Sequence, residues 1–314
     1  MTGRKRLWKS EARIIKSGIF KEITLSPSRI QFLDQLKTRL HEPILEMWKE
    51  WDEHEPRALY HFTNIEKLKK IVRSKMLWAS DVLKLNDPTE FLYATEAANF
   101  VLKCRWSELP VNISDSFSPQ GQVGLGRVWR IYVASLCARC DRLGLWWRYA
   151  DSGNGVALEF SYSDIADIVQ RTKQFAVIPM RYGRLPLLDA TEFICDLGLT
   201  LAHEADLSFD EASEFWSEVC LRILNSLLRF KHPVYMEEQE LRTISICDVA
   251  EPCFTRRQDE ELIHYIELPI VQPALKRLIT GPGVTTHTRK ELRSFLDDNG
   301  FGLVELLSVN LPLR

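Results

Sequence analysis

The chain has 314 residues, of which 45% are hydrophobic and 27% are charged, and its formal net charge is −2. This composition suits a globular protein with one large or two small domains, and the near-neutral charge excludes nucleic-acid affinity spread over the whole surface. The chain contains no long apolar run and no signal segment, and its seven cysteines follow no pairing framework. Unpaired cysteines are typical of a reducing compartment, so the sequence predicts a cytoplasmic protein without a membrane partner.

Residues 1–55 are predicted to form a helical accessory region with a basic N-terminal arm. The first 22 positions hold seven lysines or arginines against two glutamates. Such an arm either attracts nucleic acid or an acidic partner, or is a solvated terminus. Apolar residues at helical spacing predict a helix over about 29–51, which Pro43 either kinks or divides in two. Its apolar face is rich enough that we expect it to pack against the main domain or a partner chain.

After a polar linker at 52–56, periodicity and turn residues predict a mixed series of elements. Thr63 and Glu66 have the spacing of a capping box that opens the first helix of this series. In chain order we expect a strand at 58–63, a helix to about 74, an extended segment at 76–79, a helix from about 88 to 101, strands at 130–136, 155–160 and 175–182, helices through 187–230, a charged strand at 235–247, a helix at about 289–298 and a strand at 302–309. The order lacks the regular repeat of a doubly wound sheet, which favours an α+β fold.

The charged strand carries an unusual pattern. Side chains alternate between the faces of a strand, so one face of this segment holds Glu238, Glu240, Arg242, Ile244 and Ile246. Charged and apolar residues on one face indicate a strand that begins beside a cavity and ends in the core. The alternative is an exposed strand end with a glutamate–arginine pair.

Six ordered segments support a resemblance to a known family. They are Leu59-Tyr-His-Phe-Thr63, Leu77-Trp-Ala-Ser80, Leu85-Asn-Asp-Pro-Thr-Glu90, residues 146–155, Phe230-Lys-His-Pro233 and Glu238-Gln-Glu-Leu-Arg242. The set resembles a widespread bacterial family of uncharacterised function over roughly residues 58–314, which we treat as the main domain. The chain departs from that family at Trp147-Arg148, where a small polar residue and a histidine are more common.

That family in turn resembles the ADP-ribosyltransferases of the His-Tyr-Glu type. Those enzymes have a histidine in a Tyr-His-x-Thr strand, a tyrosine in a later block and a glutamate on a further strand, which here match His61, Tyr149 and Glu240. The resemblance implies a transferase-like α+β fold in which a pair of small sheets surrounds a cleft. It also implies that these three residues are catalytic.

The implied chemistry is the cleavage of NAD between nicotinamide and ribose, which builds positive charge on the ribose. Glu240 would stabilise that charge, His61 would donate to a ribose hydroxyl and Tyr149 would stack on nicotinamide. The resemblance implies that Glu238 helps the acceptor and that no metal is needed. The candidate cofactor-binding residues are Thr63, Asn86, Trp146, Arg148, Lys231 and Arg242.

The expected function is therefore consumption of NAD, either by ADP-ribosyl transfer to a protein or nucleic-acid acceptor or by hydrolysis. By resemblance, such an enzyme would serve as a toxin or an antiviral defence effector against phage. The alternative is a catalytically inert module that binds a nucleotide or nucleic acid, with His61 and Tyr149 as core residues and Asn86 as part of a helix cap. A nuclease is disfavoured because residues 238–242 lack the lysine of the usual Glu-x-Lys strand.

Overall fold

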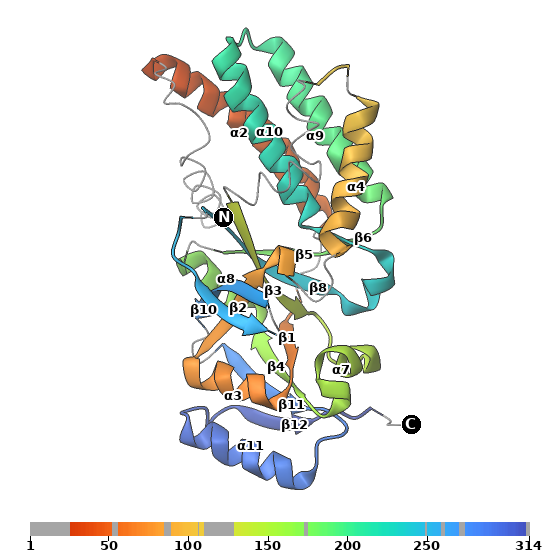
Figure 1. The fold of residues 1–314 in the computed structure, drawn as a ribbon, viewed down its shortest axis with the longest axis vertical. Helices are drawn as coiled ribbons and strands as arrows, with labels where there is room; N and C mark the ends of the chain where they lie inside the picture. The colour runs from red at the N-terminus through yellow and green to blue at the C-terminus, as the bar shows by residue number, and fades with distance from the viewer. Residues whose placement is uncertain are drawn as a thin grey trace.

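Helices gather at one end of the molecule and strands fill its middle in the computed structural model (Figure 1). The structure describes residues 26–51, 56–84, 89–105, 107–109, 129–172, 175–248, 250–258, 261–269 and 274–311. The basic arm at 1–22 and Asn86 both lie outside these residues, so the predictions made for them are not addressed.

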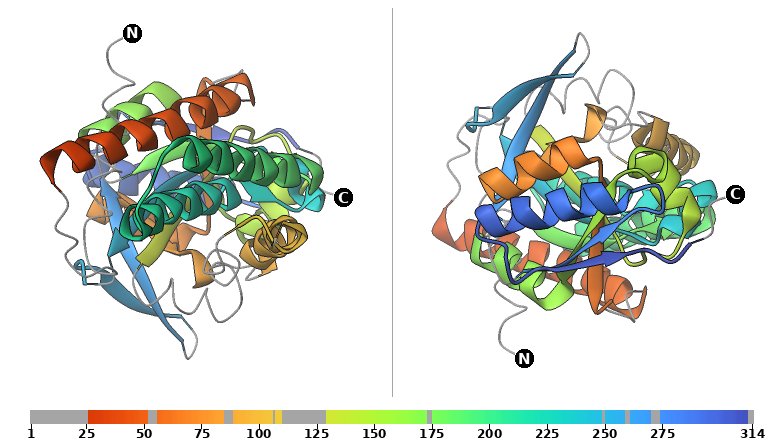
Figure 2. Two further views of the ribbon diagram at one scale, coloured as in Figure 1. Left: turned by 90° about the horizontal axis from the view of Figure 1, so that it is seen from above. Right: turned by 90° about the horizontal axis from the view of Figure 1, so that it is seen from below.

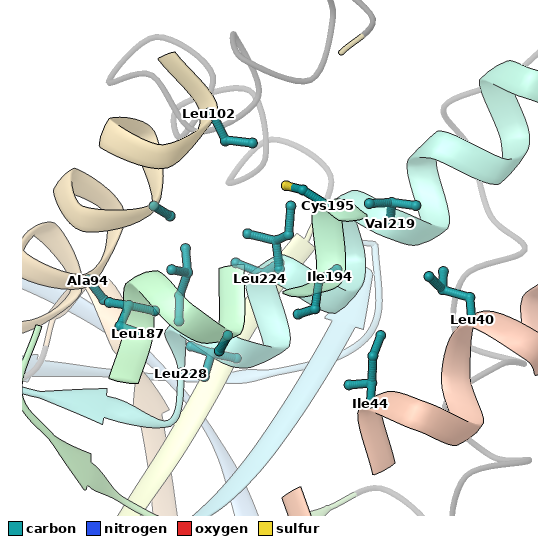
Figure 3. Close-up of a cluster of buried hydrophobic side chains, with 14 of the residues drawn as sticks. Leu40, Ile44, Ala94, Leu102, Leu187, Ile194, Cys195, Val219, Leu224 and Leu228 are labelled. Carbon is teal, nitrogen blue, oxygen red and sulfur yellow. The ribbon is translucent and has the colours of Figure 1, made fainter. Parts of the chain in front are cut away.

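The helical end consists of α2 (Pro27–Trp51), α4 (Thr89–Cys104), α9 (Leu185–Glu204) and α10 (Phe209–Leu227). Their apolar stripes meet in one buried cluster, to which α2 contributes Leu40 and Ile44 (Figure 3). Helix α2 is a single helix with Pro43 inside it, rather than two short ones. An ion pair between Arg29 and Glu211 adds a polar link between α2 and α10. The predicted accessory helix therefore shares a core with helices of the main domain.

The described strands form one sheet of ten and a second of two. The large sheet has the order β12-β11-β4-β1-β3-β2-β10-β9, and β8 joins it by pairing with both β3 and β5. Strand β3 is the branch point, because β8 pairs along its full length while β2 and β1 share its other edge. The strands are β1 (Ala58–Thr63), β2 (Met76–Asp81), β3 (Trp129–Cys137), β4 (Val156–Ser161), β5 (Ala176–Pro179), β8 (Glu240–Asp248), β9 (Phe254–Gln258), β10 (Glu261–Pro269), β11 (Leu275–Thr280) and β12 (Glu305–Ser308).

The second sheet joins β6 (Arg181–Tyr182) to β7 (Phe230–Lys231) in parallel. The α+β prediction is confirmed, since the described residues combine helices with an almost wholly antiparallel sheet. The prediction of two small sheets is wrong for the described residues. Continuous pairing through β3 merges most strands into one large sheet.

A second apolar core lies between the large sheet and three helices, namely α3 (Ile65–Ser74), α8 (Tyr162–Thr172) and α11 (Thr286–Asp298). Figure 2 shows α3 and α11 side by side beneath the strands. The guanidinium of Arg73 on α3 lies 5.4 Å from the ring centre of Phe295 on α11, which links the two helices at their surface. This core covers one face of the sheet. The opposite face packs against the helical end at β3 and β8, and against α7 (Leu143–Tyr149) at β1, β4 and β11.

Several predicted elements differ from the structure in their bounds. Asn64, not Thr63, caps α3 by accepting a hydrogen bond from the backbone of Lys67. The predicted charged strand begins only at Glu240, because Pro233 opens the short 3-10 helix η3 (Pro233–Glu238). Strands β9, β10 and β11 and helix α8 were not predicted. Nor were the short helices η1 (Val82–Lys84), η2 (Asp151–Gly153) and α7 (Leu143–Tyr149).

Close backbone contacts hold the C-terminal end of α7 in place. The turn that follows it has left-handed backbone at Asp151 and Ser152, with φ of 50° and 51°, and at Gly153, with φ of 88°. Gly281 packs so tightly on this turn that a Cβ atom there would lie 2.2 Å from the carbonyl oxygen of Gly153. Only glycine fits such an approach, so the chain after β11 positions the helix that carries Tyr149.

Candidate functional site

Five charged side chains converge where α7, η3, β7 and β8 meet. We call Arg148, Lys231, Glu238, Glu240 and Arg242 the charged cluster. Four of its members are buried, with exposures of 3% for Lys231, 2% for Glu238, 3% for Glu240 and 4% for Arg242, while the side chain of Arg148 is 41% exposed. Buried charges of this kind are rare unless they are paired or bind a ligand.

Lys231 bridges the two glutamates. Its Nζ lies 2.6 Å from Oε2 of Glu238 and 2.9 Å from Oε2 of Glu240. Arg242 holds Glu240 from the other side, with its Nε donating to Oε1 at 2.7 Å and its Nη2 donating to Oε2 at 3.2 Å. The forked guanidinium thus fixes the plane of the Glu240 carboxylate.

Glu238 faces α7 with its second oxygen. The hydroxyl of Tyr149 donates to Oε1 of Glu238 at 2.7 Å, and Nη1 of Arg148 lies 3.3 Å from the same atom. Three cations surround two carboxylates, so the charged cluster carries one net positive charge. Arg148 is both its most exposed and its most loosely bound donor.

The sequence places these groups together by simple local rules. Glu240 and Arg242 lie two residues apart on β8, and each faces the same side of the sheet as its partner on β3, Cys137 and Ser135. Gln239 takes a left-handed conformation with φ of 41° between η3 and β8. This turn brings Glu238 to the same side as Glu240, although Glu238 precedes the strand.

The cations keep Glu240 ionised. Burial by itself would raise the pKa of Glu240, but the charges of Arg242 and Lys231, with hydrogen bonds from Arg242 and Ser135, outweigh burial and lower the pKa to about 2. Burial raises the pKa of Tyr149, and the neighbouring charge of Glu238 adds to that increase. At neutral pH the cluster therefore presents a charged carboxylate beside a neutral phenol.

Three residues of this site were not predicted from the sequence. The hydroxyl of Tyr182 accepts a hydrogen bond from the backbone of Glu240 at 2.8 Å. The ring of Tyr235 lies 4.5 Å from Nζ of Lys231 and 5.8 Å from the guanidinium carbon of Arg148. Ser135 lies opposite Arg242 on β3. Pro233 was the one sequence signal for Tyr235, because a proline favours the first position of a helical turn and Tyr235 lies in η3.

His61 is not brought to the charged cluster. Tyr60, Cys137 and Glu240 are paired in a row across β1, β3 and β8, so they share one face of the sheet and His61 faces the other. Nδ1 of His61 lies 3.2 Å from the backbone oxygen of Ser135, and burial lowers the pKa of the ring. The structure therefore does not bring His61 together with Tyr149 and Glu240, because strand alternation places it on the opposite face of the sheet.

Two predicted cofactor-binding residues lie in the protein interior. Thr63 is 4% exposed and shares the face of His61. Trp146 is 0% exposed, its ring packs edge-on against Phe62, and its indole nitrogen donates to the carbonyl of Cys140 at 2.7 Å. Direct contact between Trp146 and a cofactor does not fit this packing. The structure does bring together Arg148, Lys231, Glu238 and Arg242, which the sequence analysis named as candidate site residues.

Within the described ranges, no group of three or more His, Cys, Asp or Glu side chains is placed to hold a metal ion. Among the helices described, none has both the length and the apolar character that crossing a membrane requires.

Comparison with known proteins adds one match. A domain described as "Protein of unknown function (DUF2971)" is found at residues 145–243, which is less than a third of the chain. This range holds every member of the charged cluster together with Tyr149, whereas His61 lies outside it. No curated protein and no solved structure matches the chain.

Proposed function

We propose that this chain consumes NAD, by ADP-ribosyl transfer to a macromolecular acceptor or by hydrolysis, with Glu240 as the residue that stabilises the ribosyl cation. The observation that carries the proposal is the convergence of Tyr149, Glu238 and Glu240 from separate segments into one charged cluster. The reaction needs a fixed negative charge near the breaking bond and cations for a pyrophosphate, and the charged cluster supplies both types of group.

The protonation state of Glu240 suits this role. Its pKa of about 2 keeps it ionised over the whole physiological range, so it stabilises a cation and does not act as an acid. The chemistry does not require an acid at this position. Nicotinamide leaves NAD as a neutral molecule from a positively charged ring, and the positive charge moves to the ribose.

Arg148 supplies a way for the substrate to enter the network. Its side chain is 41% exposed, and its contact with Glu238 is the longest in the charged cluster, at 3.3 Å. A pyrophosphate attracts this guanidinium more strongly than a carboxylate already shared with Lys231 does. Movement of Arg148 toward the phosphates then frees an acceptor site on Glu238 for a ribose hydroxyl. Resemblance alone carries the further proposal of a toxin or antiphage role.

The test is release of free nicotinamide from NAD by the purified chain, followed by chromatography. Glu240→Gln keeps the shape of the side chain and removes its charge, so turnover should fall about a hundredfold or more. Glu159→Gln is the matched control. Glu159 is 7% exposed and is paired with Arg277, but it belongs to a different ion pair on β4. Equal turnover by folded Glu240→Gln and wild-type protein would refute the role of Glu240.

One observation favours a second candidate, an inert nucleotide-binding module. The oxygens of Glu238 and Glu240 already accept hydrogen bonds from side chains of the protein, as in a structural ion network. In that case the chain should bind NAD, as measured by calorimetry, and release no nicotinamide. Calorimetry and chromatography on the same sample separate the two candidates.

A further inference from the structure

A second cluster lies on the outer part of the large sheet, far along the strand order from β8. Three aromatic rings and one arginine gather on one face of β2, β10 and β9. We call Trp78, Phe254, Arg256 and Tyr265 the aromatic face. Register places them together, because Tyr265 pairs with both Ser80 and Phe254, while Trp78 pairs with Glu267 and Arg256 with Ile263. Figure 2 shows the β9–β10 hairpin projecting from the body of the molecule.

The three rings form a row in which Trp78 is tilted against Tyr265 and Tyr265 is stacked on Phe254. Trp78 and Tyr265 have ring centres 4.6 Å apart, and Tyr265 and Phe254 have ring centres 5.5 Å apart with planes only 27° from parallel. Trp78 and Tyr265 are largely covered, but Phe254 at the end of the row is 53% exposed. An exposed phenylalanine backed by a rigid ring is a platform on which another flat ring can stack.

Arg256 adds a cation beside the rings. Its guanidinium carbon lies 5.6 Å from the ring centre of Trp78, and its Nη2 donates to Oγ of Ser80 at 3.1 Å. These contacts within the described part of the chain are to neutral groups, and burial lowers the pKa of Arg256. A partly buried guanidinium held by neutral groups attracts an anion, which we take to complete the site.

Two buried donors in this cluster also lack acceptors. In the described structure, neither Nε of Arg256 nor Nε1 of Trp78 finds a hydrogen-bond partner. Buried donors are almost always satisfied, so these two donors still have unused hydrogen-bonding capacity. A ligand rich in acceptor oxygens would satisfy them after a shift of the two side chains.

From these contacts we infer that the aromatic face binds a nucleotide unit, with the base stacked on Phe254 and the phosphate at Arg256. The two residues are two positions apart on one strand face, about 6.7 Å, a separation that a nucleotide spans between its base and its phosphate. Glu267 lies on the same face beside Trp78, where its negative charge repels a phosphate. The phosphate is therefore expected beside Arg256 and not beside Trp78. Sheet faces with exposed aromatic rings and arginines bind single-stranded nucleic acid in this manner. This inference does not rest on the proposed NAD chemistry.

The strand provides matched controls on its opposite face. Arg257 is the next residue after Arg256, and its partner on β10, Leu262, is 52% exposed, almost the same as Phe254. Side chains alternate along a strand, so both residues lie on the face opposite the aromatic face. Arg257→Ala removes the same charge as Arg256→Ala, and Leu262→Ala removes exposed apolar surface as Phe254→Ala does. Every variant keeps the basic arm at 1–22, so any background binding by the arm is common to all of them.

The experiment measures binding of a fluorescently labelled ten-nucleotide oligothymidylate to the full chain by anisotropy. Phe254→Ala should weaken binding about five- to 150-fold, the loss of one stacked base. Arg256→Ala should reduce the slope of log K against log salt by about 0.7, the value for one phosphate contact on a single strand. Arg257→Ala and Leu262→Ala should change binding less than twofold.

Competition then identifies the source of the nucleotide. Displacement by unlabelled oligothymidylate but not by thymidine monophosphate assigns the aromatic face to nucleic-acid strands, whereas equal displacement per nucleotide assigns it to free nucleotides. Absence of binding at about 1 mM ligand would overturn the inference, as would equal losses in the two control variants. A melting temperature that falls in Arg256→Ala with binding unchanged would assign Arg256 to the fold and would also overturn it.

Discussion

The protein buries charge in two regions that are built differently. In the helical end, Glu218 and Arg222 form an ion pair one turn apart on α10, and both side chains are 9% exposed. In the charged cluster, the members come from α7, β7, η3 and β8, and one of them, Arg148, reaches the surface. The helical pair needs only its own helix to form. The charged cluster forms only when separate segments meet.

This difference bears on function. The pair within one helix is covered by other helices and has no exposed member, so burial of charge alone does not mark a site. In the charged cluster, positive and negative side chains from several segments meet, and one of them, Arg148, is exposed and loosely bound. Such side chains can exchange their partners for a ligand. The contrast predicts that the two regions respond differently to the same kind of substitution.

The largest effect on stability should come from breaking the charged cluster. Lys231→Met leaves Glu238 and Glu240 buried without the cation that they share, which should lower the free energy of unfolding by about 3–5 kcal/mol. Replacing the whole helical pair with Glu218→Leu and Arg222→Leu should instead be neutral or stabilising by about 1–4 kcal/mol. Urea unfolding followed by circular dichroism measures both. Equal losses in the two proteins would show that the regions do not differ in this respect.

A smaller effect should distinguish Tyr149 from His61, two of the three residues that the resemblance grouped as catalytic. Tyr149→Phe removes one hydrogen bond to a charged carboxylate and should reduce nicotinamide release about 10- to 100-fold. His61→Ala should leave turnover within about threefold and lower the free energy of unfolding by about 1–3 kcal/mol, because His61 lies on the other face of the sheet. The assay that tests the proposed function serves here too. A turnover loss in His61→Ala as large as that in Tyr149→Phe would contradict the separation by faces.

The sequence predicted the local elements better than their arrangement. The strand at 58–63 and the helix ending at 298 agree with β1 and α11, because period and capping act over a few residues. The two-residue spacing of Glu240 and Arg242 predicted their shared face for the same reason. Strand pairing is not encoded so locally. The branch at β3 depends on which edges meet across the fold, and no short pattern predicts it.

The candidate site shows the same limit. Glu238 and Arg242 became candidates because they share a predicted strand face with isoleucines, and Lys231 became one through the resemblance. The position of His61 on the opposite face could not be predicted, because it depends on the register that aligns Tyr60 with Cys137 and Glu240. The full burial of Trp146 could not be predicted for a related reason, since burial of a large ring is decided by tertiary packing.

The smallest effect is that of acid on stability. Protonation should lower the free energy of unfolding through the helical end and through the charged cluster in different pH ranges. Burial and the charge of Arg222 lower the pKa of His41 from 6.5 to about 4. The folded state therefore resists protonation of His41, and its contribution to stability is present above pH 6.5 and is lost as pH falls to about 4. The pKa of Glu240 is lowered from 4.5 to about 2, so its contribution is present above pH 4.5 and is lost between that value and about 2.

Melting temperatures between pH 7 and pH 3 test this order. His41→Gln cannot gain the proton, so it should remove a drop of a few degrees between pH 6.5 and pH 4 and keep the steeper fall below pH 4. Glu240→Gln should do the reverse, starting from a lower melting temperature and losing part of the fall below pH 4.5. If His41→Gln keeps the full slope between pH 6.5 and pH 4, acid does not act through the helical end. The two buried charge clusters would then differ in construction but not in their response to protons.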